Sequence, residues 1–443
     1  MDINELKNKK VGFVSLGCDK NRVDLEEIIA RIKQFGFEIC NNPEESNIII
    51  INTCAFLEAS RKESIDTILQ MATYKNLSLE KLIVTGCLTK YKIEEVQNSL
   101  PEVDLFLEID KNKNIVDEIA KLYGVKDVKD ETPYNRVLTT PDHFAYLKIA
   151  DGCNNFCSYC TIPYIRGRYT SVPMEEILNQ ANALVNNGIT ELILVAQDVT
   201  KYGKDIYGEH RLVQLIRELS KIKKLKHIRL LYCYPELITQ ELIEEMAQNK
   251  KVCKYIDMPL QHINNDILRA MHRRNTKEAT INLINRLREK MPDIAIRTTF
   301  IVGFPGETRK QFKELCNFIK EQKLTYVGFF AYSKEEGTPA SLLKHQIPNF
   351  IKKHRVNVAG KAQFKVVLEN NAKMLNKVVD AVVDRIDGDY AVLRSEYQCP
   401  IVDTVIYVNN NNLVVGKYYK VKIIDILNYD LEGEIVKWIY QTK

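Results

Sequence analysis

The feature that most constrains the fold of this chain is an alternation of short aliphatic runs with amphipathic segments of helical length. Between residue 9 and about residue 124, four apolar runs have the length of β-strands: VGFVSL (11–16), NIIIIN (47–52), KLIVTG (81–86) and VDLFLEI (103–109). Amphipathic stretches at 24–35 and 58–74 lie between them. Strands that are buried on both faces have near-continuous apolar runs, and parallel neighbours need helical crossovers. This region therefore predicts an open parallel α/β sheet.

The same alternation resumes on a larger scale from Ala145. Six runs have the composition of strands: 145–150, 191–196, 227–232, 254–260, 295–303 and 326–332. Helical segments separate them, which predicts six βα units and a parallel sheet with the character of a partial barrel. A polar, basic helical connector covers about 340–375.

The last 68 residues change character, because they contain no helical pattern. Five short β-rich runs occur at 378–383, 389–394, 402–408, 418–425 and 433–439. They predict a small five-stranded barrel of the oligonucleotide-binding kind. The predicted class is thus a multidomain α/β protein with domains at 1–124, 142–375 and 376–443, and residues 125–141, which lack periodicity, form the linker.

Composition limits where such a chain acts. A hydrophobic fraction of 45% and a charged fraction of 27% are typical of soluble globular proteins. The longest aliphatic stretch, 48–51, is far too short to cross a bilayer, and the charged N-terminus has no apolar signal region. We expect a cytoplasmic protein without membrane contact. An odd number of cysteines, eleven, then favours metal-binding or catalytic thiols over disulfides.

Three of these cysteines form a C-x3-C-x2-C motif directly after the run at 145–150. They are Cys153, Cys157 and Cys160. Thiolates hold iron–sulfur clusters, and three ligands on a four-iron cube leave one iron open to chelate the amino and carboxylate groups of a methionine moiety. The alternatives are a zinc site or a chance grouping. Zinc usually takes a fourth local Cys or His, and none follows nearby.

Three more cysteines each follow an aliphatic run of the first region. Cys18, Cys54 and Cys87 end the segments VSLGC, IINTC and VTGC. The carboxyl ends of parallel strands share one edge of a sheet, so these thiols are predicted to converge on a second cluster, with helix starts nearby to stabilise its negative charge. The alternative is three ordinary buried thiols. That interpretation is the one we give to the other five cysteines: Cys40, Cys233, Cys253, Cys316 and Cys399.

The combined pattern resembles a known family. The C-x3-C-x2-C motif after the first strand of a six-unit βα region looks like the radical S-adenosylmethionine superfamily, and the three upstream cysteines with a C-terminal barrel narrow the resemblance to its methylthiotransferases. The segments 15–24, 229–236, 297–308 and 332–340 are similar to the RimO branch, and Glu335–Glu336 stand where the tRNA-modifying branch tends to have Arg-Pro. The chain departs from the RimO pattern at Asp19, often a proline there, and Tyr164 is closer to the tRNA-modifying enzymes.

This resemblance implies two [4Fe–4S] clusters and S-adenosylmethionine as cofactors. It implies that a 5′-deoxyadenosyl radical activates the β-carbon of an aspartate in the small-subunit ribosomal protein S-twelve, which then receives a methylthio group. It also implies an electron donor such as flavodoxin or ferredoxin, and we expect a monomer. The alternatives are an enzyme that acts on a tRNA adenosine and a non-catalytic iron–sulfur protein that binds RNA or the ribosome.

In this superfamily the cofactor lies across the carboxyl ends of the strands, so residues at strand ends are the candidates to contact it. The candidates are Gln197, Gln261, Gly303 and Tyr332. Gly303 would let the backbone approach an adenosine, and Tyr332 would stack on a ring. In the alternative interpretation, Gly303 belongs only to a strand-to-helix turn. We assign no catalytic side chain beyond the clusters.

The charge of the last segment bears on the target. Residues 376–443 hold eight Lys and Arg against ten Asp and Glu, a net charge of −2. A barrel that binds RNA should be basic, whereas an acidic barrel suits a basic ribosomal protein. We expect Asp384, Asp387 and Glu396 to take part in this docking. The alternative is a solvated acidic surface without a partner.

Overall fold

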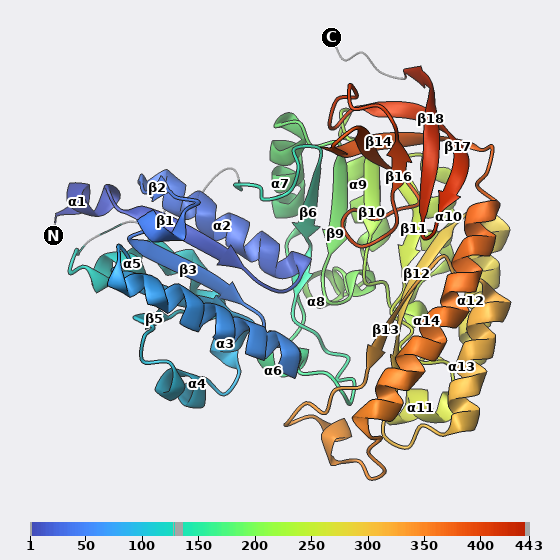
Figure 1. Ribbon diagram of the computed structural model, residues 1–443, viewed down its shortest axis with the longest axis horizontal. Helices are drawn as coiled ribbons and strands as arrows, with labels where there is room; N and C mark the ends of the chain where they lie inside the picture. The colour runs from blue at the N-terminus through green and yellow to red at the C-terminus, as the bar shows by residue number, and fades with distance from the viewer. Residues whose placement is uncertain (1, 127, 129–135, 439–443) are drawn as a thin grey trace.

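The computed structural model describes residues 2–126, 128 and 136–438 (Figure 1). Residues 127 and 129–135 of the predicted linker, and the last residue of the fifth predicted barrel strand, lie outside the described residues. The described chain forms two parallel sheets, a closed barrel and a small two-stranded antiparallel sheet. None of its described helices combines the length and the apolar composition that a membrane span needs.

The first sheet has the strand order β2-β1-β3-β4-β5 and is parallel throughout, as predicted. Its strands are β1 (Lys10–Ser15), β2 (Glu38–Ile39), β3 (Ile48–Thr53), β4 (Lys81–Gly86) and β5 (Leu105–Phe106). The helices of this region are α1 (Ile3–Lys7), α2 (Asp19–Phe35), α3 (Glu58–Ala72), α4 (Ile93–Ser99) and α5 (Ile115–Leu122). Successive residues of β3 point to opposite faces, so Ile48 and Ile50 pack with α2 and α5, and Ile49 and Ile51 pack with α3.

The second sheet has the order β13-β12-β11-β10-β9-β6, again entirely parallel, and its open edges confirm a partial barrel. Its strands are β6 (Phe144–Lys148), β9 (Glu191–Val195), β10 (His227–Leu230), β11 (Val252–Asp257), β12 (Ala295–Val302) and β13 (Tyr326–Ala331). The main helices are α7 (Met174–Asn186), α9 (Leu212–Ser220), α10 (Gln240–Gln248), α12 (Lys277–Lys290), α13 (Arg309–Gln322) and α14 (Asn349–Ala372). Shorter pieces complete this part: β7 (Ala150–Asp151), β8 (Thr170–Ser171), α6 (Ile162–Ile165), α8 (Lys204–Tyr207) and α11 (Asn265–Ala270).

The C-terminal strands close into the predicted five-stranded barrel, in the order β14-β15-β16-β18-β17. They are β14 (Val378–Asp387), β15 (Tyr390–Ser395), β16 (Ile406–Val408), β17 (Tyr418–Leu427) and β18 (Asp430–Trp438). The barrel sits on the end of the second sheet where α14 delivers the chain (Figure 1).

Buried ion pairs fix the barrel to the second sheet. Glu191 of β9 accepts hydrogen bonds from Arg229 of β10, at 2.7 Å, and from Arg394 of β15. All three side chains are at most 1% exposed. Removing one partner would leave an uncompensated buried charge, so this contact holds the barrel in one position.

This interface corrects part of the predicted docking surface. Asp384 pairs with His143 at 2.6 Å and with Arg394 at 2.9 Å, and the Glu396 carboxylate accepts the backbone N–H of Lys254 at 2.8 Å. Both acids therefore face the second sheet, where Asp384 is ion-paired and Glu396 is held by a backbone hydrogen bond. Of the three acids predicted to dock a partner, Asp387 is the one that is exposed to solvent.

Candidate functional site

The structure brings the three cysteines that end strands of the first sheet close together. We call Cys18, Cys54 and Cys87 the strand-end triad. Cys18 caps the N-terminus of α2 after β1, Cys54 follows β3, and Cys87 follows β4 and begins a 3₁₀ turn. Burial raises the pKa of Cys54 and Cys87, and the nearby Cys18 thiol adds to both increases. Of the helix starts expected beside these thiols, an α-helix begins directly after Cys18 and a 3₁₀ helix begins at Cys87, whereas α3 begins four residues after Cys54.

Two glycines make this close approach possible. Gly17 has a φ of 95°, and a Cβ there would come within 3.0 Å of the Cys54 Cβ and 3.3 Å of its Sγ. Gly86 has a φ of 91°, and its Cβ would lie 2.4 Å from the carbonyl oxygen of Thr53. L-residues rarely adopt this conformation, and no side chain fits the space. The glycines therefore let the three strand ends converge.

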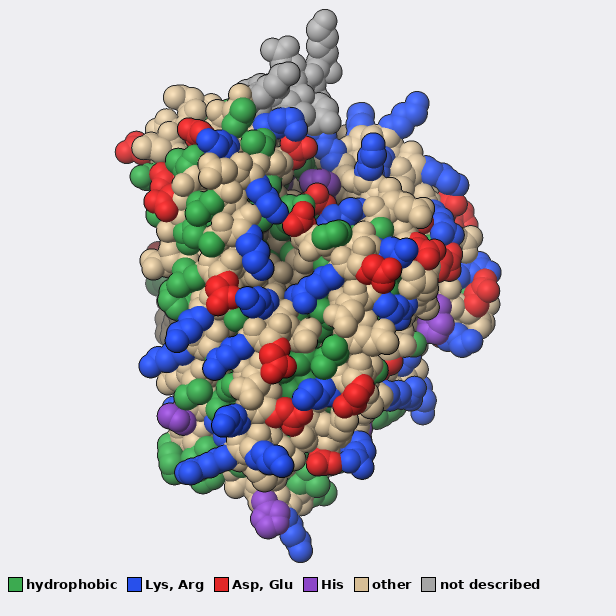
Figure 2. All heavy atoms as spheres, turned by 90° about the vertical axis from the view of Figure 1, so that its right-hand side faces the viewer, with side chains coloured by type: hydrophobic (Ala, Val, Ile, Leu, Met, Phe, Trp, Pro, Cys, Tyr) green, Lys and Arg blue, Asp and Glu red, His purple; other side chains and the backbone are tan. Residues whose placement is uncertain are grey.

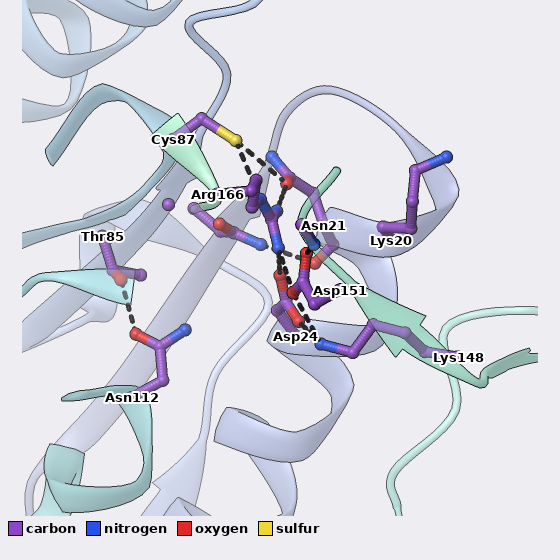
Figure 3. A network of polar contacts seen from close by, with 12 residues as sticks. Lys20, Asn21, Asp24, Thr85, Cys87, Asn112, Lys148, Asp151 and Arg166 are labelled. Carbon is purple, nitrogen blue, oxygen red and sulfur yellow. Dashed lines mark hydrogen bonds and ion pairs between the residues drawn. The ribbon is translucent and has the colours of Figure 1, made fainter. Parts of the chain in front are cut away.

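Arg166, which follows α6, connects the strand-end triad to the second sheet (Figure 3). Its Nε–H donates to the Cys87 Sγ at 3.4 Å, and its Nη1 donates to Asp24 at 2.8 Å and to Asp151 at 2.9 Å. Its Nη2 bonds the side-chain oxygen of Asn21. The side chain is 3% exposed, so these contacts are shielded from water.

The charges around Arg166 balance within this buried network. Burial raises the pKa of Asp151, but Lys148 and Arg166 outweigh it and hold that pKa below its usual range. Burial raises the pKa of Cys87 to about 11 against the opposing effect of Arg166. A guanidinium that donates to the sulfur stabilises the thiolate form that a metal requires.

The second group, Cys153, Cys157 and Cys160, lies in the loop after β7, and we call it the loop triad. The backbone N–H of Asn155 points to the Cys153 Sγ at 3.5 Å. Burial and the neighbouring Cys157 raise the pKa of Cys160, and burial raises that of Cys153 to about 11. The Cys160 thiol thus lies near both other thiols of the loop triad, whose charges raise its pKa.

Arg273 supplies the positive charge on this side. Its Nη1 lies 3.9 Å from the Cys157 Sγ, and its guanidinium lies 4.2 Å from the ring of Tyr234, whose hydroxyl is 3.7 Å from the same sulfur. The Arg273 Nε is buried without a hydrogen-bond partner among the described residues. Such a donor fits a site that receives a negatively charged group.

Each triad offers soft thiol donors beside one arginine, which suits an iron–sulfur cluster. Within the described residues, no three His, Cys, Asp or Glu side chains are arranged to hold a single metal ion. Each thiolate of a cube binds a different iron, so a cube needs thiols around a larger space than a single ion does. The assignment of a cluster to each triad therefore stays a prediction.

Asp151 lies between the two triads. It precedes Cys153 by two residues, and its carboxylate binds both Arg166 and the side-chain N–H of Gln197, at 2.9 Å each. The Gln197 Oε1 is buried and has no partner among the described residues. An acceptor left open beside the loop triad fits a ligand that donates hydrogen bonds, such as the amino group of S-adenosylmethionine.

The other predicted cofactor contacts lie at strand ends, in varied surroundings. Gln261 has a φ of 68° and bridges to Phe300 of β12. A Cβ on Gly303 would lie 2.5 Å from the Cγ of Lys352, so this glycine makes room for a side chain of α14. Tyr332 is buried, with the edge of Phe304 on one side and Lys352 over its ring. Their contact with the cofactor stays a prediction.

Sequence reasoning missed Arg166, Asn21 and Arg273. Asn21 lies in SLGCDKNRVD and Arg166 in TIPYIRGR, each within six residues of a triad cysteine. Proximity to the motifs was the available signal, but the carboxylates that neutralise Arg166 are up to 142 positions away in sequence.

Known domain families match all three structural regions. Residues 10–108 match the uncharacterized protein family UPF0004, residues 147–319 match the Radical SAM superfamily, and residues 377–436 match the TRAM domain. Radical SAM proteins use a [4Fe–4S] cluster and S-adenosylmethionine, so the central region is that of an enzyme.

Two solved structures share the fold at low sequence identity. The radical S-adenosylmethionine methyltransferase TsrM from Kitasatospora setae superposes with a TM-score of 0.56 at 14% identity, over 76% of this chain and 77% of that one. The cobalamin-dependent radical enzyme OxsB superposes with a TM-score of 0.53 at 13% identity, over 82% of this chain and 58% of that one.

Curated relatives match nearly the whole chain. A protein of Clostridium tetani named ribosomal protein uS12 methylthiotransferase RimO is 46% identical over 96% of this chain and 98% of its own length. Proteins of the same name from Acetivibrio thermocellus and Alkaliphilus oremlandii are 44% and 45% identical, over 97% and 96% of this chain and 98% of their own lengths. This chain belongs to the RimO family of radical S-adenosylmethionine methylthiotransferases.

Proposed function

We propose that this chain adds a methylthio group to the β-carbon of an aspartate in ribosomal protein uS12. The observation that carries the proposal is the pair of thiol triads joined through Arg166 and Asp151 in a chain of the RimO family. The loop triad would hold one [4Fe–4S] cluster, and the strand-end triad would hold a second. When bound, the first cluster would supply the electron that splits S-adenosylmethionine, and the second would hold the sulfur that is transferred.

The chain's own residues position and shield these groups. Arg166 would hold the Cys87 thiolate and keep it oriented toward the second sheet. Arg273 would balance the negative charge at Cys157, and the open Gln197 oxygen would accept a hydrogen bond from S-adenosylmethionine. Because no side chain can remove hydrogen from an unactivated carbon, the protein contributes binding and orientation.

The reaction also needs an electron source. We propose flavodoxin or ferredoxin in that role, a monomeric enzyme, and action in the cytoplasm, where ribosomal proteins are made. Light scattering of the anaerobic protein at micromolar concentration tests the monomer, and reduction of the enzyme by each purified donor tests the electron source.

Two triple variants test the cluster assignment. Anaerobically reconstituted protein should hold about eight irons if both sites are four-iron cubes. Replacing the loop triad with Ala should leave about half the iron and abolish formation of 5′-deoxyadenosine. Replacing the strand-end triad should also leave about half the iron but spare 5′-deoxyadenosine formation, while no methylthio mass is added to uS12.

The substrate is tested with the same reduced protein. Purified uS12, small ribosomal subunits and bulk tRNA are each incubated with the enzyme and examined by mass spectrometry. Methylthio mass on uS12 supports the proposal. Methylthio mass on tRNA alone would contradict the uS12 target, and product from the strand-end variant would contradict the role of the second cluster.

A further inference from the structure

The positive charge of this chain is concentrated in one segment. Residues 309–375 contain thirteen Lys and Arg against five Asp and Glu, a net charge of +8, whereas the whole chain carries +5. The rest of the chain is therefore slightly acidic. The segment runs from α13 through α14, the last two helices on the outside of the second sheet.

The two helices present these charges to solvent side by side. Arg355 of α14 packs over the ring of Phe312 of α13, so the helices are neighbours. Seven exposed cations lie on them, and we call these the basic face: Arg309, Lys310, Lys313, Lys320, Lys353, Lys361 and Lys365. Figure 2 shows this side of the molecule, with Lys and Arg side chains spread widely over it and Asp and Glu side chains among them.

The spacing along α14 places its lysines in one row. Lys361 and Lys365 follow Lys353 by eight and twelve residues, so the three lysines lie on one i, i+4 ridge that winds by about 120° around the helix. At 1.5 Å per residue the row spans about 18 Å. An extended polyanion could therefore contact all three lysines at once.

The basic face lacks internal neutralisation. Among the described residues, no carboxylate forms an ion pair with any of the seven cations. Two neighbouring carboxylates are used elsewhere, because Glu314 pairs with Lys277 at 2.8 Å and Glu369 pairs with Lys323 at 2.7 Å, while Glu321 beside Lys320 is exposed to solvent. Some exposed lysines beside the first sheet are neutralised by carboxylates; for example, Lys62 of α3 forms an ion pair with Asp66 at 2.7 Å.

We propose that the basic face binds RNA phosphates, so that the enzyme engages uS12 within an RNA-containing particle. The inference rests on the proposed function for its choice of partner. Helix α14 ends against the barrel. There Asn371 donates to the carbonyl of Tyr429 at 2.9 Å, and Phe364 packs on the Tyr429 ring. The basic face for RNA thus adjoins the barrel, whose exposed Asp387 and Asp389 suit a basic protein, and RNA and basic protein are the two components of a ribosomal subunit.

The test uses the full-length, cluster-loaded protein and polyuridylate as the RNA probe. The variant carries Lys353→Gln, Lys361→Gln and Lys365→Gln. The matched control carries Lys62→Gln, Lys111→Gln and Lys121→Gln, which removes the same charge from exposed, ion-paired lysines of the first sheet. Affinity is measured by fluorescence anisotropy across a salt series.

The variant should bind polyuridylate at least about ten-fold more weakly than wild type at low salt, and its salt slope should fall by about 2, since each phosphate contact on a single strand contributes about 0.7. The control should bind like wild type. Equal weakening of both proteins, no weakening of either, or tighter binding to phosphatidylglycerol vesicles than to RNA would overturn the proposal.

A second arm separates this inference from the proposed function. Methylthiolation of purified uS12 should proceed at the wild-type rate in the variant, whereas methylthiolation of intact small subunits should slow by about the same factor as RNA binding. If the wild-type enzyme modifies neither purified uS12 nor intact small subunits, the proposed function is refuted. The anisotropy measurement would still decide whether the basic face binds RNA. Equal rates on intact subunits would overturn the role of the basic face there.

Discussion

At the scale of single residues, Arg166 has the contacts of a residue that tunes a metal ligand. Its guanidinium is buried, held by Asp24 and Asp151, and donates to the Cys87 sulfur. Hydrogen bonds and positive charge at the sulfur favour the reduced, more negative cluster, and outer contacts of this kind change metal affinity by about 10- to 100-fold. Lys148 also pairs with both carboxylates, so they keep one cation if Arg166 is changed.

Arg166→Gln should therefore weaken retention of the second cluster about ten-fold or more and make its midpoint potential more negative. Arg166→Lys keeps the positive charge, so its cluster retention and midpoint potential should lie between those of Arg166→Gln and wild type. Iron release to a chelator and a spectroscopic redox titration, both in protein without the loop triad, isolate the second cluster. Arg168→Gln, an exposed arginine two residues on, is the control. An unchanged potential in Arg166→Gln would show that Arg166 only supports the fold.

The cysteines outside the triads should behave differently. Four of them are buried in the hydrophobic interior, whereas Cys40 is half-buried and its thiol donates to the carbonyl of Asn42 at 3.3 Å, which corrects the expectation that all five are buried. Cys253→Ala removes one fully buried sulfur and should lower the free energy of unfolding by about 1 kcal/mol. Its iron content should match wild type. Loss of about four irons would mean that the ligand set is misassigned.

At the scale of elements, a loop from the second sheet is clamped to the first. Glu335 is 1% exposed; its carboxylate accepts from Arg61 of α3 at 2.7 Å and from the backbone N–H of Glu58 at 3.1 Å. Glu336 next to it is 72% exposed and pairs with Lys92. Glu335, singled out in sequence by its resemblance to RimO, therefore acts as a structural clamp.

The two neighbouring glutamates give a matched pair of variants. Glu335→Gln leaves Arg61 without its anion in a shielded site, so the free energy of unfolding should fall by about 3 kcal/mol. Glu336→Gln breaks an exposed pair and should cost less than about 1 kcal/mol. Urea denaturation followed by circular dichroism compares them. Equal costs would contradict the clamp.

The elements themselves were largely predictable, because burial on both faces leaves a periodic signal. The two parallel sheets and the barrel follow from the strand runs. The start of α2 could not be predicted in this way. The amphipathic pattern indicates a helix from residue 24, whereas the helix begins at Asp19. Its first turn buries Lys20 and Asn21 against other strands and so carries no apolar pattern. The two-residue β2 is likewise too short to leave a pattern.

At the scale of the whole molecule, the contacts between regions could not be read from sequence. Glu191 and Arg394 lie 203 positions apart, and nothing local marks either as buried. The strand-end triad was predictable because a parallel sheet brings its carboxyl ends to one edge. Arg166 was not, because its partners come from α2 and from β7, which are far apart in the sequence.

The barrel interface should respond to acid through His227. This residue lies under Tyr418 of β17, with ring centroids 5.4 Å apart. Burial lowers the pKa of His227 to about 4; Arg229, Arg394 and Lys226 add to this effect, and Glu191 opposes it. Below pH 6.5 the unfolded chain protonates this histidine, while the folded protein does not until about pH 4.

Stability should therefore fall as the pH decreases from 6.5 to about 4, by at most about 1.4 kcal/mol per pH unit from this group. His227→Gln should remove that part of the slope, and His272→Gln, an exposed control, should not. Urea midpoints at pH 7, 6 and 5 measure the difference. A slope that is identical in His227→Gln and wild type would contradict the assignment.

The last prediction concerns how the fixed barrel meets its protein target. Asp387 and Asp389 lie at the exposed turn between β14 and β15, away from the acids that anchor the barrel. If they steer a basic protein, reversing both to Lys should raise the KM for purified uS12 about ten-fold and reduce the salt dependence of the rate, because exposed ion pairs contribute up to about 1 kcal/mol each. Basal cleavage of S-adenosylmethionine should not change, since both triads lie outside the barrel.

The control reverses Glu44 and Glu63, two exposed acids of the first sheet, and should leave the KM at the wild-type value. The same assay on small subunits separates the barrel from the basic face, because Asp387→Lys with Asp389→Lys should slow modification of free and subunit-bound uS12 alike, whereas loss of the basic face should slow only the latter. If reversing Asp387 and Asp389 leaves the KM unchanged, these two acids are solvent-exposed residues without a role in docking. Recognition of uS12 would then lie elsewhere on the chain.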